Sequence, residues 1–191
     1  MSKGLTLATI TMRIMGVDGY NPITSESSQW INWVTNFGLG TCRYCAEQNG
    51  KIYKYDSPPE HIPVHDRCNC YIEPVVTIMI GTATIDGSFG ADKWLYLYKT
   101  LPGNYISKEN AKKKGWNNLM GNLRKVVPGA TIGGNVYYDY GNKLPQKPGR
   151  VWHEADINYT GGYRNQHRII YSNDGLMFVT YDHYETFYEL V

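Results

Sequence analysis

Residues 149–176, GRVWHEADINYTGGYRNQHRIIYSNDGL, decide the fold of the C-terminal half of the chain. Two β-prone segments, Arg150–Ala155 and Arg168–Ser172, are separated by a turn that contains Gly161-Gly162, and Asn173-Asp174-Gly175 ends the second segment. Strands joined by such turns usually pair antiparallel with their sequence neighbours. The stretch therefore predicts two adjacent strands of an antiparallel sheet.

The strand pattern continues on both sides of this stretch, and helices precede it. Three further strands are expected, at Thr131–Tyr138, Leu176–Tyr181 and Glu185–Leu190. Three helices are expected before them, at Asp92–Thr100, at Ser107–Lys114 with Ser107 as N-cap, and at Asn122–Val127. This order predicts an α+β domain whose N-terminal helices pack on one face of an antiparallel sheet.

The first 80 residues have a different composition. All four cysteines lie there, as Cys42-x-x-Cys45 and, after 22 residues, Cys68-x-Cys70. The stretch GTATIDGSFG, residues 81–90, consists mostly of small and polar residues. We therefore divide the chain into a small Cys-rich module (1–80), a linker (81–89) and the α+β domain (90–191). Within the module we expect a strand at Leu5–Met15, a helix at Ser25–Phe37 and a strand at Pro74–Ile80.

The cysteine spacing has two interpretations. Two close pairs suit a structural zinc site of the zinc-ribbon kind, with Cys42, Cys45, Cys68 and Cys70 as ligands and His65 as a substitute. Two disulfides are the alternative, and they require an oxidising compartment. Because the N-terminus lacks the apolar run of a secretory signal, we favour zinc.

Composition and charge narrow the functional classes. No apolar run reaches the ~20 residues that span a bilayer, so we expect no membrane span. The net charge is +2, but residues 1–88 carry 6 basic and 8 acidic side chains, whereas residues 89–191 carry 13 and 9. Positive charge concentrated in one half is common in proteins that bind phosphate groups, and it also fits an ordinary basic surface.

Four side chains of the second half carry the candidate chemistry. Glu154, Arg164, Arg168 and His183 lie near strand ends and in turns, where adjacent antiparallel strands bring such positions side by side. A carboxylate can accept a proton, an imidazolium can donate one, and guanidinium groups can hold charge on phosphate oxygens. On residue types alone, a surface ion-pair network with a turn histidine is the commoner explanation.

Several segments, in order and with similar spacing, resemble barnase and its bacterial ribonuclease relatives. They are LPGNYISKENAKKKGW (101–116), GNL (121–123), PGATIGG (128–134), KLP (143–145), GRVWHEADINYTGGYRNQHRIIYSNDGL (149–176) and TYDHYETF (180–187). The resemblance covers nearly the whole of that fold. It implies a barnase-like endoribonuclease that acts on single-stranded RNA.

By this resemblance, Glu154 is the general base and His183 the general acid. Glu154 removes the proton of the ribose 2′-hydroxyl, and His183 protonates the departing 5′-oxygen, leaving a 2′,3′-cyclic phosphate. The substrate supplies the nucleophile, so no cofactor is expected in catalysis. DNA, which lacks that hydroxyl, is not expected to be cut.

The resemblance also assigns the residues around this pair. Arg164 and Arg168 bind phosphate, and Lys108 stabilises the transition state. Tyr184 contacts the substrate. Asp156 lies two residues past Glu154 and on the same side by strand period, so we expect it to hold the arginine pair in place.

The loop YDYGN, residues 138–142, departs from the family pattern. Where the family reads guanine with a glutamate, this chain has Gly141. Asp139 or backbone groups are candidates to replace that contact, and Tyr138 or Tyr140 to stack on a base. We therefore expect a weak preference for guanine. Asn135 likewise stands where the family often has an aspartate.

Residues 41–70, TCRYCAEQNGKIY…PPEHIPVHDRCNC, resemble the tail of the F-like minor head proteins of Mu-type phages. A head-protein fragment joined to a ribonuclease implies a bacterial toxin and a barstar-like immunity protein that presents acidic groups to the cationic cleft. We expect synthesis in the cytoplasm, export by a non-Sec route or a carrier, and action in the cytoplasm of a target cell. The alternative is a phage-derived structural or RNA-binding protein without catalytic activity.

Overall fold

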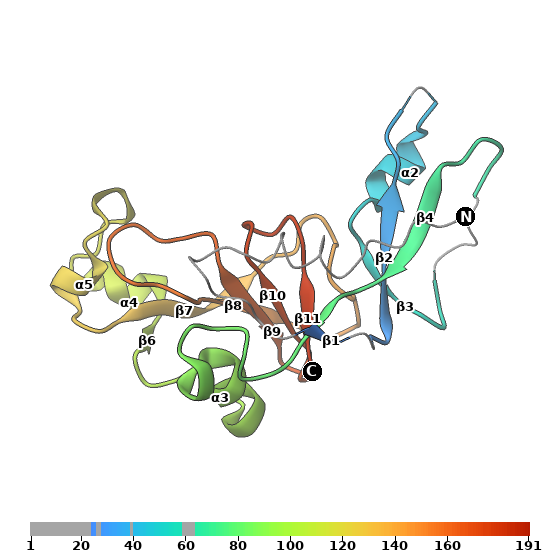
Figure 1. Ribbon diagram of the computed structural model, residues 1–191. Coiled ribbons are helices and arrows are strands. Elements are labelled where there is room, and N and C mark those ends of the chain that lie inside the picture. The colour runs from blue at the N-terminus through green and yellow to red at the C-terminus, as the bar shows by residue number, and fades with distance from the viewer. Residues whose placement is uncertain (1–23, 26–27, 39, 59–63) are drawn as a thin grey trace.

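The computed structural model describes residues 24–25, 28–38, 40–58 and 64–191. Its main body is built on an eight-stranded sheet, beside which stand a three-stranded sheet and helix α2 (Figure 1). The strand predicted at Leu5–Met15 lies outside the described residues. Within the described ranges, no helix has the length and apolar character needed to cross a membrane.

Five antiparallel strands form the centre of the larger sheet. In spatial order they are β11 (Tyr188–Leu190), β10 (Met177–Thr180), β9 (Arg168–Ser172), β8 (Trp152–Asp156) and β7 (Thr131–Tyr137). Each coincides with a predicted strand, and the predicted antiparallel meander is confirmed.

Short strands extend this sheet at both edges. β6 (Tyr105–Ile106) pairs parallel with β7 at one edge. At the other edge, β5 (Thr77–Ile78) pairs parallel with β11, and β1 (Thr24–Ser25) pairs antiparallel with β5. Thr77 and Ile78 are fully buried. Residues that precede the linker of the sequence-based division thus take part in the larger sheet.

The helices of the second half begin and end close to where the sequence predicts. They are α3 (Ala91–Tyr98), α4 (Lys108–Lys113) and α5 (Leu123–Val126), with short 3₁₀ helices η1 (Gly87–Phe89) and η2 (Asn118–Met120). Ser107 is the N-cap of α4, and its hydroxyl accepts a hydrogen bond from the N–H of Asn110 at 3.2 Å. The predicted α+β fold class is confirmed.

The two faces of the central sheet have different roles. Ala155 and Ile169 pair across β8 and β9, and both belong to the core cluster that contains Leu95 of α3. Their sequence neighbours Glu154 and Arg168 point to the opposite face, because side chains alternate along a strand. The candidate catalytic face is therefore the one that α3 does not cover.

The smaller sheet overturns one prediction. β2 (Trp30–Thr35) lies between β3 (Ile52–Lys54) and β4 (Cys70–Pro74), so the helix predicted at Ser25–Phe37 is wrong. Ile31, Trp33 and Thr35 are buried in alternation with half-buried residues, which is the period of a strand. Pairing with strands on both sides outweighs the helical spacing of the apolar residues.

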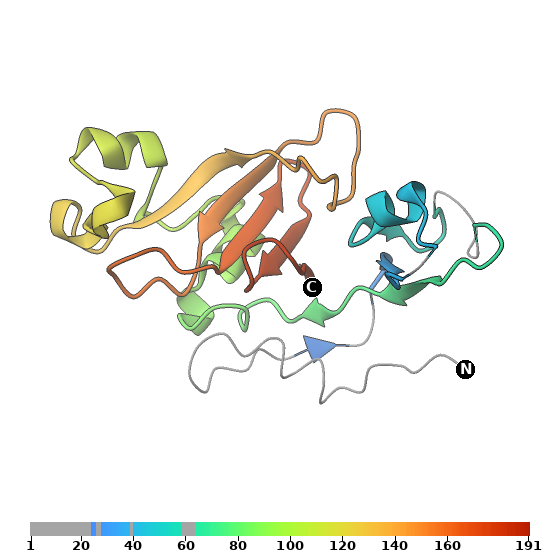
Figure 2. The same cartoon turned by 90° about the horizontal axis from the view of Figure 1, so that it is seen from above.

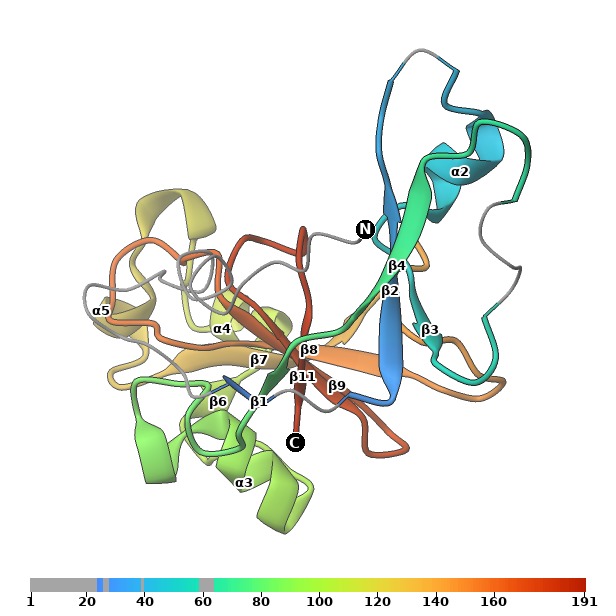
Figure 3. The same cartoon turned by 45° about the vertical axis from the view of Figure 1, so that its right-hand side comes forward.

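The strand predicted at Pro74–Ile80 is also divided, because Pro74 ends β4 and only Thr77–Ile78 form β5. Helix α2 (Arg43–Gln48) follows β2 and packs beside it. Figures 2 and 3 show this helix and its sheet on the side of the larger sheet that is away from α4 and α5.

Direct contacts join the module to the larger sheet. The N–H of Ile52 donates to the carbonyl oxygen of Lys143 at 2.7 Å. Glu189 of β11 accepts hydrogen bonds from Ser28 Oγ at 2.6 Å and from Trp30 Nε1 at 3.1 Å. Side chains from both parts also share one core cluster, which includes Ile52, Val75, Leu144, Trp152, Ile170 and Phe178.

Candidate active site

Glu154, on β8, is the centre of the candidate active site. The residue is only 6% exposed, yet both carboxylate oxygens have partners. Oε1 forms an ion pair with Nζ of Lys108, and Oε2 accepts a hydrogen bond from the hydroxyl of Tyr184. A strand, the first residue of α4 and a turn after β10 thus bring three predicted site residues together.

The backbone near β7 aims Lys108 at this carboxylate. A register shift between Gly133 and Asn135 places Asn135 opposite Glu154 in the β7–β8 pair. Asn135 Oδ1 accepts a hydrogen bond from the N–H of Lys108 at 3.1 Å, which fixes the start of α4. Gly133 is needed because a Cβ there would lie 2.5 Å from Cδ1 of Tyr105.

Opposing effects act on the pKa of Glu154. Burial raises it, whereas hydrogen bonds from Lys108 and Tyr184 and the positive charges of Lys108 and Arg164 lower it. The net result is a pKa below the usual value for a glutamate. Burial, together with the adjacent Glu154 carboxylate, raises the pKa of the Tyr184 hydroxyl, which therefore remains a donor. Glu154 is ionised at neutral pH, as a general base must be.

Asp156, two residues further along β8, lies between two arginines. Arg164 donates to it twice, from Nε to Oδ2 at 2.7 Å and from Nη2 to Oδ1 at 2.6 Å. Arg168 faces Asp156 across the β8–β9 ladder, and its Nε lies 3.0 Å from Oδ1, within ion-pair distance but not aligned for a hydrogen bond. Nη1 of Arg168 donates to the carbonyl oxygens of Asn165 and His167 at 2.8 and 2.7 Å.

These contacts make a rigid cationic pair beside Glu154. Asp156 and Arg168 are 1% and 3% exposed, so neither can turn away to solvent. The positive charge of Arg164 lowers the pKa of Glu154, and the negative charge of Glu154 raises the pKa of Arg164. Two guanidinium groups fixed next to a carboxylate can hold a phosphate while the carboxylate accepts a proton.

His183 lies in the turn after β10, with an exposed side chain. His183 and Tyr184 have φ angles of 59° and 73°, in the left-handed region that non-glycine residues seldom adopt. Thr180 holds the turn: its hydroxyl donates to Oδ1 of Asp182 and accepts from the N–H of Tyr184, both at 2.9 Å. The ring centres of His183 and Tyr184 are 4.8 Å apart, so this strained turn presents the imidazole beside a partner of Glu154.

The loop after β7 is shaped by Asp139. Its Oδ1 accepts from the N–H of Lys143 at 3.0 Å, and its Oδ2 accepts from the N–H of Leu144 at 2.8 Å and from Nε2 of Gln146 at 3.0 Å. The Asp139 carboxylate, which the sequence offered as a candidate to read a base, thus has three partners within the loop. Its geometry is that of a group that holds the loop in shape.

Two tyrosines are the aromatic groups that this loop exposes. Tyr138 and Tyr140 are 65% and 90% exposed, and their rings stack with centres 5.9 Å apart. Exposed rings of this kind can stack on unpaired bases, since every base has a flat face. Gly141 adds no side chain.

Two residues that the sequence did not single out connect this loop with the turn after β10 that carries His183 and Tyr184, here called the catalytic turn. The ring of Tyr137 stacks on that of Tyr184, with centres 5.0 Å apart. Nζ of Lys143 donates to the carbonyl oxygen of Tyr184 at 3.0 Å. Tyr137 lies two residues after Asn135 on one strand, so alternation could have indicated its face; no sequence signal identifies the contact of Lys143.

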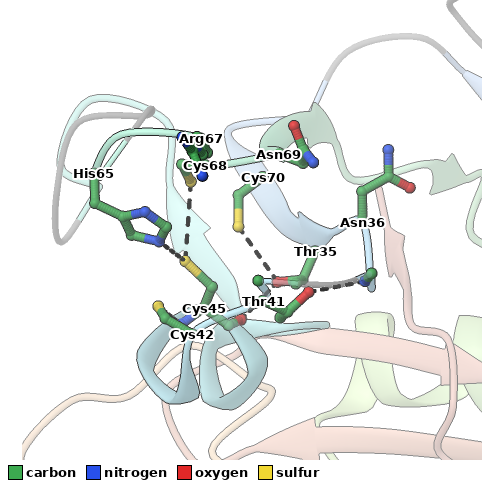
Figure 4. Close-up of a pocket in the computed structure, with 12 residues that line it drawn as sticks. Thr35, Asn36, Thr41, Cys42, Cys45, His65, Arg67, Cys68, Asn69 and Cys70 are labelled. Atoms are coloured by element: carbon green, nitrogen blue, oxygen red, sulfur yellow. Dashed lines mark hydrogen bonds between the residues drawn. The ribbon is translucent and has the colours of Figure 1, made fainter.

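The four cysteines predicted as metal ligands lie together at the end of the smaller sheet, and all are free thiols (Figure 4). Cys42 is the N-cap of α2, Cys45 lies in that helix, and Cys70 begins β4. Burial raises the pKa of Cys68, but the N–H groups of Cys70 and Val64 and the neighbouring thiols outweigh this effect, and the pKa is about 7. His65 also lies in this cluster.

Known proteins resemble the second half of the chain. The model of a family described as ribonuclease matches residues 94–190. Over 105 residues the chain is 48% identical to a ribonuclease of Heyndrickxia coagulans, and the match covers 55% of this chain and 96% of that protein. Ribonucleases of Bacillus intermedius and Bacillus pumilus are also 48% identical over 105 residues, with 65% of each covered. The matched family segment contains Lys108, Glu154 and His183, and the cysteines lie outside it.

Proposed function

The chain belongs to the ribonuclease family and is an endoribonuclease, and we propose that it cleaves single-stranded RNA with Glu154 as general base and His183 as general acid. The observation that carries this proposal is the buried Glu154 carboxylate, which Lys108 and Tyr184 keep ionised beside two fixed arginines. A base held ready next to a phosphate-binding pair suits attack by a hydroxyl group of the substrate.

In the proposed reaction, Glu154 accepts the proton of a ribose 2′-hydroxyl. The 2′-oxygen forms a bond to the adjacent phosphorus, and the bond from phosphorus to the 5′-oxygen breaks. His183 gives a proton to that leaving oxygen, so the products are a 2′,3′-cyclic phosphate and a free 5′-hydroxyl. Lys108, Arg164 and Arg168 stabilise the negative charge that grows on the phosphoryl oxygens.

The groups around Glu154 and His183 favour a single-stranded substrate. Tyr138 and Tyr140 expose their rings at the loop that Lys143 ties to the catalytic turn. Unpaired bases can be splayed onto such rings, whereas paired bases in an A-form helix cannot. Tyr184 lies between Glu154 and His183, where a bound nucleotide would meet it.

Two variants and a matched control test the assignment. Glu154→Gln and His183→Ala should each lower turnover by about 10²–10⁴-fold, because each removes one proton-transfer group. Glu109→Gln is the control, since Glu109 forms only an exposed ion pair with Lys113 on α4. Full activity in either site variant, with all proteins folded, would remove the assigned mechanism.

We further propose that the protein is a bacterial toxin that acts in the cytoplasm of a target cell. The resemblance of residues 41–70 to a phage head-protein tail supports a fusion between a carried module and an enzyme. The exposed part of Lys108 and the Arg164 side chain offer positive charge, in the same site as His183, to an immunity protein with acidic groups, of barstar type.

Growth on expression tests the toxin role. Expression of the full chain in a bacterial cytoplasm should arrest growth and degrade cellular RNA, whereas the His183→Ala chain should be tolerated. Equal growth with the active and inactive chains, at equal protein levels, would contradict it. The alternative, an RNA-binding protein without catalysis, is disfavoured by the family to which the chain belongs.

A further inference from the structure

We propose that Cys42, Cys45, His65 and Cys68 bind one zinc ion, and that Cys70 is a core residue rather than a ligand. The candidate ligand atoms form two groups that share Cys45: Cys42, Cys45 and His65, and Cys45, Cys68 and Cys70. Within each group all ligand atoms lie within 4.8 Å of one another; the proposed set draws on both groups, and Cys68 shares its group with Cys70 rather than with Cys42 or His65. The residues line a small cavity of about 20 Å³, enough for one ion.

The distances between the sulfur atoms fit a shared metal. Sγ of Cys45 lies 3.9 Å from Sγ of Cys68. Two thiolates bound tetrahedrally at about 2.3 Å from one zinc ion are about 3.8 Å apart, whereas disulfide sulfurs are about 2.05 Å apart. The observed separation fits two thiolates of one ion and is too long for a disulfide bond.

His65 has the orientation of a metal ligand. Its Nε2 lies 3.4 Å from Sγ of Cys45 (Figure 4). Its Nδ1 lies 2.8 Å from the carbonyl oxygen of Asp66. A carbonyl that accepts from one ring nitrogen fixes the tautomer and leaves the other nitrogen free to bind a metal, as is usual for ligating histidines. The free nitrogen here is the one that faces the cysteines.

Cys42 and Cys70 differ in what holds them. Sγ of Cys42 accepts a hydrogen bond from the N–H of Cys45 at 3.4 Å, which favours its thiolate form. Cys70 instead pairs with Thr35 in the β2–β4 ladder, and its thiol donates to Thr35 Oγ1 at 3.7 Å. Cys45 and Cys70 are 2% and 8% exposed and share a core cluster with Trp33, so the contact with Thr35 rather than burial distinguishes Cys70. The Cys70 thiol has a partner in Thr35, whereas Nε2 of His65 faces Cys45, so we assign the fourth position to His65.

Such an ion would stabilise the module. Its core cluster contains few large residues, chiefly Trp33, and small domains with thin cores often depend on a metal. The ion would join α2, through Cys42 and Cys45, to the segment that enters β4, through His65 and Cys68. Binding requires thiolates and a neutral imidazole, so it should weaken at acid pH.

Elemental analysis of the full chain, purified without added zinc, measures the first part of this proposal. We expect about one zinc per chain. Replacement by Co²⁺ then counts the thiolates without any mutation, because charge-transfer absorption grows with each sulfur bound; a three-thiolate spectrum is expected. A four-thiolate spectrum would show that Cys70 is a ligand.

Two variants separate the candidates for the fourth position. Cys70→Ser should keep about one zinc per chain, whereas His65→Ala should lose the metal or bind it far more weakly. The reverse result would overturn the assignment of His65. Absence of zinc together with a mass lower by four hydrogens, the mark of two disulfides, would overturn the metal site itself.

Discussion

The carboxylate of Glu154 is paired with the ammonium group of Lys108, which lies 46 positions earlier in the chain. The pair joins β8 to the first residue of α4. Asn135 connects the two elements, because it lies opposite Glu154 in the β7–β8 ladder and its Oδ1 accepts a hydrogen bond from the N–H of Lys108. Burial raises the pKa of Glu154, but Lys108 and the Tyr184 hydroxyl, with the charge of Arg164, lower it by more. The geometry therefore sets the pH at which the base becomes active.

The pH profile of kcat/KM should show this effect. Its acidic limb should lie below the usual pKa range of a glutamate, because the pKa of Glu154 is lowered and the ionised form is the base. Tyr184→Phe removes one hydrogen bond to the carboxylate and should move this limb to higher pH. Tyr140→Phe, which changes an exposed hydroxyl elsewhere, is the control. An acidic limb that stays in place in Tyr184→Phe would contradict the assigned cause.

Asp156→Asn should destabilise the protein and impair phosphate binding. The change leaves the buried Arg168 charge without its counterion and weakens the fork that holds Arg164. Loss of one partner of a buried ion pair costs about 3–5 kcal/mol of unfolding free energy. Denaturant unfolding measures it, and Asp56→Asn, at an exposed pair with Lys54, should change little. Equal stability of the two variants would show that Asp156 is not needed to hold the arginines.

The loop after β7 should contribute stacking rather than guanine recognition. Tyr140→Ala should raise KM roughly 5- to 150-fold, because one base–aromatic contact is worth about 1–3 kcal/mol, while Tyr140→Phe should behave as the unaltered chain. Mapping of products on a mixed-sequence RNA should show weak preference for guanine, since Gly141 has no side chain. Strict cleavage after guanine would show that backbone groups of the loop read the base.

Glu189 predicts a second pH effect, on stability. Burial raises its pKa, against the hydrogen bonds from Ser28 and Trp30. The folded chain then binds a proton that the unfolded chain releases, so stability falls as pH rises from the ordinary glutamate range through the raised value. Glu189→Gln removes the buried charge, keeps an oxygen acceptor for Trp30 Nε1, and places an amide NH₂ that can donate to Ser28 Oγ. It should unfold at a higher temperature than the unaltered chain at pH 7–8, and a lower temperature there would contradict this account.

Local patterns account for what the sequence predicted correctly. Strands β7 to β11 and helices α3 and α4 follow from alternation, glycine-containing turns and the Ser107 cap, which depend on near neighbours. The helix expected at Ser25–Phe37 was wrong because β2 is set by pairing with β3 and β4, which lie far away in the sequence.

The same distinction applies to the site. A phosphate site could be predicted because adjacent antiparallel strands bring strand-end and turn residues side by side, and because the family resemblance assigns them roles. The residues are Glu154, Asp156, Arg164, Arg168 and His183. The contact of Lys143 with Tyr184 and that of Ile52 with Lys143 involve backbone carbonyls, which carry no sequence signal. The sequence offered Asp139 as a candidate to contact a base, but its carboxylate oxygens accept hydrogen bonds from N–H groups of its own loop.

The most direct test of the proposed reaction is cleavage of an RNA oligonucleotide in which one ribose, at a mapped cleavage position, lacks its 2′-hydroxyl. The account predicts that cleavage stops at that bond alone and continues elsewhere, in excess EDTA, with products that end in 2′,3′-cyclic phosphate. Cleavage at the 2′-deoxy position, or products with a 3′-hydroxyl and a 5′-phosphate, would contradict it, because the nucleophile would then not come from the ribose that Glu154 deprotonates.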